Sequence, residues 1–222
     1  AAMKKIAMLF AIPALPATPL CAFAASGNTW ASTAANTPDI ALAARYGNSM
    51  FIYFVLFLLL FLYLSHYLNK RNITLSGKNE RILLFTILAA ALLIRVCFAP
   101  VIEGWPNDIY ANKYWASNAA KGLSSFYSSG WCDYPPLFIY VLALVGKLAS
   151  IPWLSGHFTL LVKLPSILAD VVTAYLIYKV AAKQLKPVLA LTAAAAYAFH
   201  PAVFLDSTIW GQVDSFFTMI IV

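Results

Sequence analysis

Residues 54–61 read Phe-Val-Leu-Phe-Leu-Leu-Leu-Phe and form the centre of an almost unbroken apolar run from Met50 to Leu68. The run approaches the ~20 residues that a helix needs to cross the hydrocarbon core of a bilayer. Apolar residues make up 62% of the chain and its mean hydropathy is +0.78, whereas an ordinary soluble domain is about 45–50% apolar. The sequence therefore predicts an all-α fold, a polytopic transmembrane helical protein.

The distribution of charged residues indicates on which side of the membrane the following segments lie. Lys70 to Arg81 is basic, and the positive-inside rule places such a loop in the cytoplasm. Ile82 to Ala99 is then expected to cross outward and to place the next loop on the extracytoplasmic side. Val162 to Val180 is a further span, and it ends in lysines that we expect to be cytoplasmic. These lysines can be cytoplasmic only if the short apolar segment Leu137 to Leu148 does not cross the membrane fully, so we expect it to be re-entrant or oblique. Residues 188–205 would then cross outward.

The N-terminal part is expected to be separate from the transmembrane domain. Residues 1–25 resemble a signal peptide, with Lys4 and Lys5 before an apolar stretch and a small-x-small site at Ala22-Phe23-Ala24. Residues 26–49 read as an exported polar segment with little structure, and 50–222 as the transmembrane domain. The chain stops within an apolar run, so we expect it to be the front part of a longer protein.

Composition also limits the partners. The net charge is +7, but lysine and arginine stand in short clusters beside apolar runs, which indicates membrane topology rather than a nucleic-acid-binding face. We therefore expect membrane lipid as a partner and no nucleic acid. The three cysteines, Cys21, Cys97 and Cys132, are widely spaced and form neither a metal-binding pattern nor a disulfide framework.

Two clusters of carboxylates and aromatics lie at the expected outer boundary, in a chain with only 10% charged residues. Glu103, Trp105 and Asp108 belong to the first, and Asp133 and Tyr134 belong to the second. Between them, six residues at helical spacing indicate an amphipathic helix at the membrane interface: Ile109, Tyr110, Tyr114, Trp115, Ala119 and Leu123. We interpret the clusters as the active-site loop of a membrane enzyme that acts on lipid-linked sugars.

Four motifs in a fixed order carry a resemblance to a known family. They are Asn107-Asp108-Ile109-Tyr110 with Tyr114-Trp115-Ala116, Asp133-Tyr134-Pro135-Pro136-Leu137, Lys163-Leu164-Pro165-Ser166-Ile167-Leu168-Ala169-Asp170, and His200-Pro201-Ala202-Val203 leading into Trp210-Gly211-Gln212-Val213-Asp214-Ser215. Together they resemble the N-terminal half of the GT-C superfamily of polytopic membrane glycosyltransferases. The nearest resemblance is to bacterial proteins similar to the mannosyltransferases of GPI-anchor assembly, over about Ile82 to Val222. Departures are His200, where the pattern has Asn, the extra N-terminal signal and span, and the missing C-terminal half.

The resemblance implies transfer of a mannose-like hexose from a polyprenyl-phosphate carrier to a hydroxyl acceptor. The reaction would take place on the extracytoplasmic face of the bacterial inner membrane, with inversion. Family members carry an essential acidic residue in the first outer loop, and Asp108 holds that position. The chemistry agrees, because inverting transfer needs a carboxylate to accept the acceptor's proton. The alternative is that Asn107 or Asp108 only caps the following helix.

Several residues are candidates for substrate binding. Arg95, Lys163 and a protonated His200 would suit the carrier phosphate. Arg95 would otherwise snorkel to the interface, and His200 would otherwise pack between helices. Asp170 lies two helical turns after Lys163, so both would share one face of the span, where Asp170 is either functional or a structural contact.

The remaining candidates suit a sugar. Trp210, Gln212 and Asp214 form an aromatic and polar patch, although Asp214 would also serve as a helix cap. Asp133 would orient Tyr134 or bind a sugar hydroxyl, unless it belongs only to the turn before the two prolines. Asp108 and Asp133 are also the residues that would hold a divalent cation with a phosphate, but the sequence commits to no metal.

Two other functions stay open. A transporter or flippase of lipid-linked saccharides would share the membrane class, but it would be expected to show internal repeats, and the sequence has none. A non-catalytic subunit of a glycan-assembly complex would bind partner membrane subunits. Loss of transfer on replacing Asp108 would separate the enzyme from both.

Overall fold

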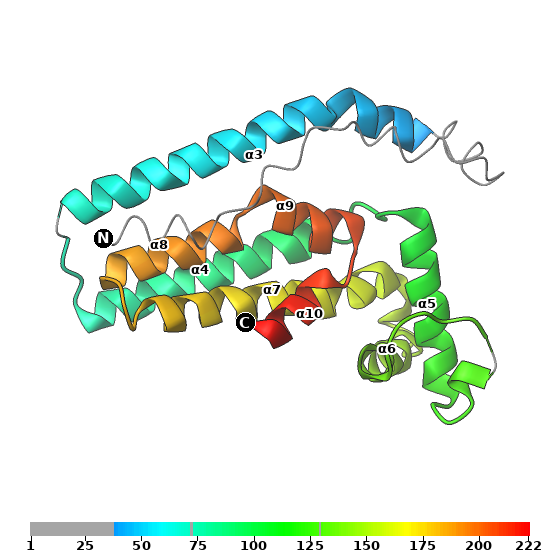
Figure 1. Cartoon of the computed structure of the whole chain (residues 1–222). Helices are drawn as coiled ribbons and strands as arrows, with labels where there is room; N and C mark the ends of the chain where they lie inside the picture. Colours follow the sequence, from blue (N-terminus) through cyan, green and yellow to red (C-terminus); the bar gives the residue numbers. More distant parts are fainter. Residues whose placement is uncertain (1–37, 72, 129) are drawn as a thin grey trace. The chain divides into compact units, whose positions relative to one another are not determined.

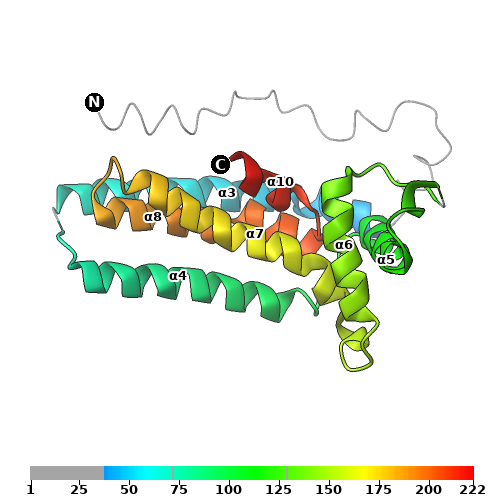
Figure 2. The same ribbon diagram turned by 90° about the horizontal axis from the view of Figure 1, so that it is seen from below.

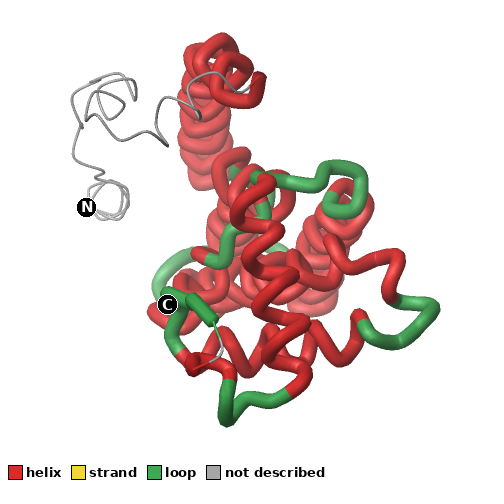
Figure 3. Tube along the Cα trace, turned by 90° about the vertical axis from the view of Figure 1, so that its right-hand side faces the viewer, coloured by secondary structure: helices red, strands yellow, loops and turns green. Residues whose placement is uncertain are grey.

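The structure, a computed structural model, describes residues 38–71, 73–128 and 130–222, with side chains from Phe51 onward. These residues form helices and loops and contain no strand (Figure 3). The predicted all-α class is therefore confirmed. The chain divides into two units, Ala1–Ile52 and Tyr53–Val222, and the site described below lies within the second.

The helices follow one another along the chain with short connections. In order they are α3 (Pro38–Lys70), α4 (Gly77–Phe98), α5 (Pro106–Lys121), α6 (Pro136–Ala149), α7 (Phe158–Ala181), α8 (Pro187–Ala198), α9 (Pro201–Phe204) and α10 (Asp214–Ile221). Between them lie two single 3-10 turns, η2 (Phe126–Ser128) and η3 (Ser155–His157), and a π-helix, η4 (Leu205–Trp210). Proline opens α5, α6, α8 and α9, where its missing N–H would have had no partner in the helix.

Among the described residues, three helical segments are long and apolar enough to cross a membrane: Phe51–Lys70, Gly77–Phe98 and Ser155–Ala181. They agree with the three spans that hydropathy predicts. Pro187–Ala198 and Pro201–Trp210 form a further pair that qualifies together but is bent by 42°. The bend follows from the sequence, because Pro201 cannot supply the N–H that would continue α8.

The N-terminal predictions have a mixed outcome. The signal-like segment 1–25 lies outside the described residues. The polar segment 26–49 was expected to have little structure, but α3 already begins at Pro38. The end of that segment is rich in alanine, the strongest helix former, and it continues directly into the apolar run. The helix is therefore longer than the apolar run on which the prediction was based.

Helices α4, α7 and α8 pack lengthwise against one another (Figures 1 and 2). Their contact is built on small residues, since Ala91, Ala174 and Ala198 are buried together with at most 1% of each exposed. Small side chains let helix backbones approach closely, which is how helices associate where lipid removes the hydrophobic drive. This packing fixes the bundle from which the site residues project.

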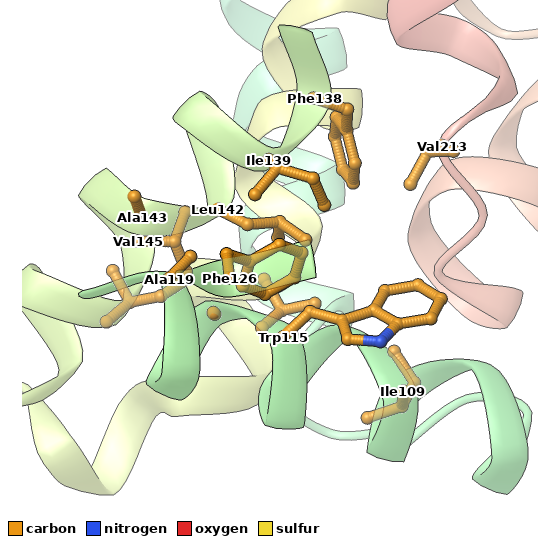
Figure 4. Packing of buried hydrophobic residues seen from close by; sticks show 13 residues of the cluster. Ile109, Trp115, Ala119, Phe126, Phe138, Ile139, Leu142, Ala143, Val145 and Val213 are labelled. Atoms are coloured by element: carbon orange, nitrogen blue, oxygen red, sulfur yellow. The ribbon is translucent and has the colours of Figure 1, made fainter. Parts of the chain in front are cut away.

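Helices α5 and α6 form a hairpin at the end of the bundle where α7 begins (Figures 1 and 2). Ile109 and Trp115 on the buried face of α5 belong to one hydrophobic cluster with Phe138 and Leu142 of α6 and with Val213 (Figure 4). The predicted amphipathic helix therefore exists, but its aromatic residues do not share one face. Tyr110 and Tyr114 are exposed, whereas Trp115 is buried and donates its indole N–H to the carbonyl of Trp131 at 2.8 Å.

The hairpin returns the chain to the end of the bundle from which it left. Lys163, in the second turn of α7, donates to the carbonyl of Ala99 directly after α4, so the start of α7 lies beside the end of α4. Helix α6 is apolar but only 14 residues long, and it does not qualify as a span. This geometry agrees with the expectation that Leu137 to Leu148 does not cross the membrane fully.

Candidate functional site

The centre of the site is the carboxylate of Asp108, in the first turn of α5. Its Oδ2 atom accepts a hydrogen bond from the indole N–H of Trp210 at 2.9 Å and another from the side-chain amide of Gln212 at 2.6 Å. Trp210, the last residue of η4, and Gln212, two positions later, thus hold a carboxylate about a hundred positions earlier in the chain. Asp108 is half-buried, so the carboxylate remains accessible.

Asp108 does not act as the N-cap of α5. The residue at the N-cap position of α5 is Trp105, and it makes no side-chain capping bond. Pro106 follows at the first helical position, so Asp108 is the third residue of the helix and does not occupy the N-cap position. Because its hydrogen bonds run to Trp210 and Gln212, the alternative that Asp108 only satisfies free backbone N–H groups does not describe its contacts.

Two glycines allow the loops around Asp108 to meet. Gly104 and Gly211 both have positive φ, at 100° and 88°. A Cβ atom on Gly104 would lie 2.4 Å from the carbonyl oxygen of Trp210, and one on Gly211 would lie 2.5 Å from Cδ1 of Ile109. The close approach lets the Trp105 N–H donate to the carbonyl of Trp210 at 3.1 Å and sets their rings 5.6 Å apart.

Tyr134 lies among three carboxylates at the same end of the molecule. Burial raises its pKa, and the negative charges of Asp214, Asp133 and Asp108 raise it further. Its ring packs at 5.3 Å from that of Trp115 and at 5.7 Å from that of Phe138, both in the hairpin core. The structure thus brings the second acidic cluster and Asp214 close to the residues around Asp108. Asp133 and Asp214 are themselves exposed.

Glu103 is tied to protein groups at the edge of this region. Lys113 of α5 forms an ion pair with Glu103, and the hydroxyl of Thr159 donates to both of its carboxylate oxygens at 3.0 Å. The hydrogen bond from Lys113 lowers the pKa of Glu103, and the hydrogen bond from Thr159 lowers it further against an opposing effect of burial. Glu103 therefore links the α4–α5 loop to α5 and to the start of α7.

Lys163 is close to the site but faces the backbone. Its ammonium group donates to four carbonyl oxygens, those of Ala99, Ile102, Thr208 and Ile209, at 2.7–3.3 Å. The residue is 1% exposed. The sequence assigned Lys163 to the carrier phosphate, whereas in the structure its partners are protein groups.

Arg95 and Asp170 form a buried ion pair at 3.2 Å between α4 and α7. Asp170 also accepts from the hydroxyl of Ser207 in η4 at 2.5 Å. Arg95 is 1% exposed, so it does not snorkel to the membrane surface. The expectation that Lys163 and Asp170 face the same way is confirmed, because both contact η4.

His200 sits at the start of α9, away from these contacts. Its Nδ1 atom accepts the backbone N–H of Ala202 at 3.2 Å, and its ring lies edge-on to Phe57 at 5.3 Å. These contacts correspond to the helix-packing alternative.

The sequence interpretation missed Asp206, Lys113 and Thr159. Asp206 is a half-buried carboxylate in η4, and its carbonyl accepts the backbone N–H groups of Gly211 and Gln212. The signal was available, because an ionisable side chain within an apolar segment is costly and marks a site to inspect. Lys113 and Thr159 had no comparable signal, because only the fold brings them to Glu103.

The described residues contain no group of three or more His, Cys, Asp or Glu side chains placed to hold a metal ion. Asp108 and Asp133, the pair that would hold a divalent cation, both lie near Tyr134. Asp108 already uses one oxygen for two protein donors.

Residues 133–222 match a family model described as dolichyl-phosphate-mannose-protein mannosyltransferase. The match includes Tyr134, Lys163, Asp170, Trp210 and Gln212, and it begins after Asp108. It confirms the resemblance to the GT-C mannosyltransferases and supports a membrane glycosyltransferase of the GT-C type. Comparison with curated proteins and with solved structures found no match.

Proposed function

We propose that this protein transfers a mannose-like hexose from a polyprenyl-phosphate carrier to a hydroxyl acceptor on the extracytoplasmic side of the bacterial inner membrane. The observation that carries the proposal is the half-buried carboxylate of Asp108, held through one oxygen by Trp210 and Gln212. The family match supports the donor class, because the family is described by a lipid-phosphate mannose.

In the proposed reaction the acceptor oxygen attacks the anomeric carbon from the face opposite the phosphate. The bond from that carbon to the phosphate oxygen breaks, and its electron pair leaves with the lipid phosphate. The hydroxyl proton passes to Oδ1 of Asp108, which accepts no hydrogen bond from the described residues. A carboxylate in this position supplies the general base that an inverting transfer needs, and its two fixed donors keep it oriented.

Aromatic and polar groups around Asp108 are proposed to bind the sugar. Trp210 is 48% exposed and lies beside Trp105, so one face can stack on the apolar side of a hexose ring. Asp133 and Asp214 lie near enough to Tyr134 to influence its pKa, and these three residues are proposed to contact the sugar hydroxyls. We do not assign the carrier phosphate to Arg95 or Lys163, because Arg95 is buried in an ion pair with Asp170 and the ammonium group of Lys163 donates to backbone carbonyls.

The test is transfer from radiolabelled polyprenyl-phosphate mannose by the full-length protein in nanodiscs, with polyprenyl-phosphate glucose as the competing donor. Asp108→Asn should lower the transfer rate by about 10²–10⁴-fold, the contribution of a general base. Its thermal midpoint should stay within about 2 °C, because the change is isosteric.

Glu80→Gln is the matched control, because it neutralises a carboxylate that accepts from Tyr178 in the distal part of α7. It should retain transfer. Full activity of Asp108→Asn would show that Asp108 is not the general base. Inactivity of the wild type with both donors and a crude acceptor extract would favour the transporter or the non-catalytic subunit.

A further inference from the structure

The ammonium group of Lys163 has an environment that the proposed chemistry does not use. A lysine ammonium carries three N–H donors, and four carbonyl oxygens lie within hydrogen-bonding distance of the Lys163 ammonium, at 2.7–3.3 Å. The residue is almost completely buried. A buried cation is tolerated only when such partners replace water, so binding a phosphate here would require breaking bonds that already stabilise the charge.

The carbonyls come from two segments that lead into the site. Ala99 and Ile102 belong to the connection from α4 to α5, which continues to Trp105 and Asp108. Thr208 and Ile209 are the last residues of η4 before Trp210. One ammonium group therefore joins the segment that carries the carboxylate to the segment that carries its two donors.

The packing leaves little freedom around this junction. A Cβ atom on Gly211 would lie 3.1 Å from Cε of Lys163, so the lysine side chain packs directly under the turn between Trp210 and Gln212. A Cβ atom on Gly104 would lie 3.1 Å from the carbonyl oxygen of Ile209, itself a partner of Lys163. A change in the length or polarity of the lysine side chain should therefore shift the backbone of both segments.

We propose that Lys163 is a positioning residue: its ammonium group crosslinks the carbonyls of the two segments and so sets the donors of Trp210 and Gln212 against Asp108. The expected effect on catalysis rests on the proposed function, whereas the crosslink between the two segments does not depend on it. Lys163 acts through Asp108 and does not touch the sugar or the carrier phosphate.

The first readout is local hydrogen exchange and is independent of activity. In Lys163→Met, a substitution that keeps an unbranched side chain one atom shorter and removes its donors, exchange should rise by about 10-fold or more in peptides covering 99–108 and 205–213. These peptides contain the N–H groups of Trp105, Gly211 and Gln212, whose bonds cross or close the junction. Exchange in α6 should stay unchanged. Lys147→Met, which removes an exposed ammonium from α6, is the matched control and should leave both peptides unchanged.

The second readout separates positioning from phosphate binding. Lys163→Met should lower kcat for transfer by about 10–100-fold and leave KM for polyprenyl-phosphate mannose within about threefold, because ground-state binding is intact. A raised KM with unchanged exchange at 99–108 and 205–213 would overturn the proposal and indicate that Lys163 binds the carrier phosphate. If Lys163→Met does not fold, Lys163→Gln is the second variant, because it retains two donors on a shorter side chain. It should show intermediate exchange, and unchanged exchange would also overturn the proposal.

If the wild type transfers no sugar, the proposed function fails. The exchange experiment would still show whether Lys163 crosslinks the two segments.

Discussion

At the scale of single residues, the two oxygens of Asp108 have different surroundings. Oδ2 accepts from Trp210 and Gln212, whereas Oδ1 accepts from none of the described residues. A carboxylate held in this way has a fixed orientation and one free oxygen. The two donors therefore act together, and neither should be replaceable without loss of orientation.

Removal of these donors should reduce transfer without abolishing it. Trp210→Phe keeps an aromatic ring but loses the indole N–H, and Gln212→Met keeps the length of the side chain but loses the amide. Each should lower kcat by about 10-fold, roughly the 1–2 kcal/mol of one charge-assisted hydrogen bond. The measurement is a double-mutant cycle on kcat.

Because both donors orient the same oxygen, the effects should not add. Additive losses, with 100-fold in the double variant, would indicate independent roles such as separate sugar contacts. Met219→Leu on α10 is a control for an apolar substitution beyond the site and should leave kcat unchanged.

Glu103 gives a prediction about pH. The pKa of Glu103 lies below its ordinary value of 4.5, chiefly through the hydrogen bond from Lys113. A carboxyl group with a lowered pKa in the folded state stabilises the fold above the unfolded pKa, and this contribution is lost as the pH falls through the folded value. Lys113→Met should therefore lower the thermal midpoint by about 1–2 °C near pH 7, as expected of an exposed ion pair.

The difference between Lys113→Met and the wild type should shrink as the pH is lowered below 4.5, measured by a series of thermal melts in detergent. Lys121→Met is the control, because the hydrogen bond that Lys121 makes within the described residues goes to the neutral side chain of Asn118. A pH-independent difference for Lys113→Met would show that the effect comes from packing and not from Glu103.

At the scale of elements, the hairpin of α5 and α6 depends on one close crossing. A Cβ atom on Gly146 would lie 2.0 Å from the carbonyl oxygen of Ala116 and 2.9 Å from Cβ of Ala120. The backbone of α6 thus rests directly on α5 at this point. Since α5 carries Asp108, the crossing also determines where the carboxylate stands.

Gly146→Ala should therefore destabilise the protein. Alanine favours a helix over glycine by about 1 kcal/mol, but the new methyl group meets a backbone oxygen that cannot move aside, and overpacking costs about 1–3 kcal/mol or more. The net result should be a fall of several degrees in the thermal midpoint, together with weaker transfer. Gly156→Ala is the control, because a Cβ atom there meets nothing within 4 Å, and a comparable loss in Gly156→Ala would contradict the argument.

The π-helix η4 is the second element on which the site depends. Helix α7 holds it at two points, through the ammonium of Lys163 and through the carboxylate of Asp170, which accepts from Ser207. Single-turn π-helices are frequent at functional sites. Here the wider turn ends at Gly211, in a left-handed conformation, and directs Trp210 and Gln212 toward α5.

At the scale of the whole molecule, a cluster of exposed cations and a group of carboxylates lie at opposite ends of the α4–α7–α8 bundle. Exposed cations stand where α4 begins and α7 ends, among them Lys78, Arg81, Lys179 and Lys183. The carboxylates Asp108, Asp133 and Asp214 gather around Tyr134 at the opposite end, near the start of α7. The positive-inside rule then predicts that the basic end is cytoplasmic, which is the basis of the proposed extracytoplasmic location of the site.

Cysteine labelling tests this orientation. In a variant with Cys21, Cys97 and Cys132 replaced by serine, Ser155→Cys should react with a membrane-impermeant maleimide on intact spheroplasts. Lys183→Cys should react only after permeabilisation, since it lies past the other end of α7. Both positions are exposed, so reactivity reports sidedness and not burial. The reverse pattern would place the site in the cytoplasm and contradict the proposed location.

The sequence by itself determined the membrane class, three spans and the presence of Asp108, Trp210 and Gln212 in motifs. Hydropathy and short motifs are local properties, so they can be read without knowing the fold. The same local signals placed α4, α6 and α7 within a few residues of their bounds.

Only the tertiary structure decided which groups meet. Trp210 and Gln212 reach Asp108, Lys163 reaches four carbonyls, and Arg95 pairs with Asp170 because helices distant in sequence pack side by side. An isolated lysine or arginine in a span suggests an anionic ligand, yet a carbonyl cluster or a buried aspartate satisfies the same charge. Residues with the same local signal thus acquire different roles, because burial removes water and each charge takes the partners that the packing supplies.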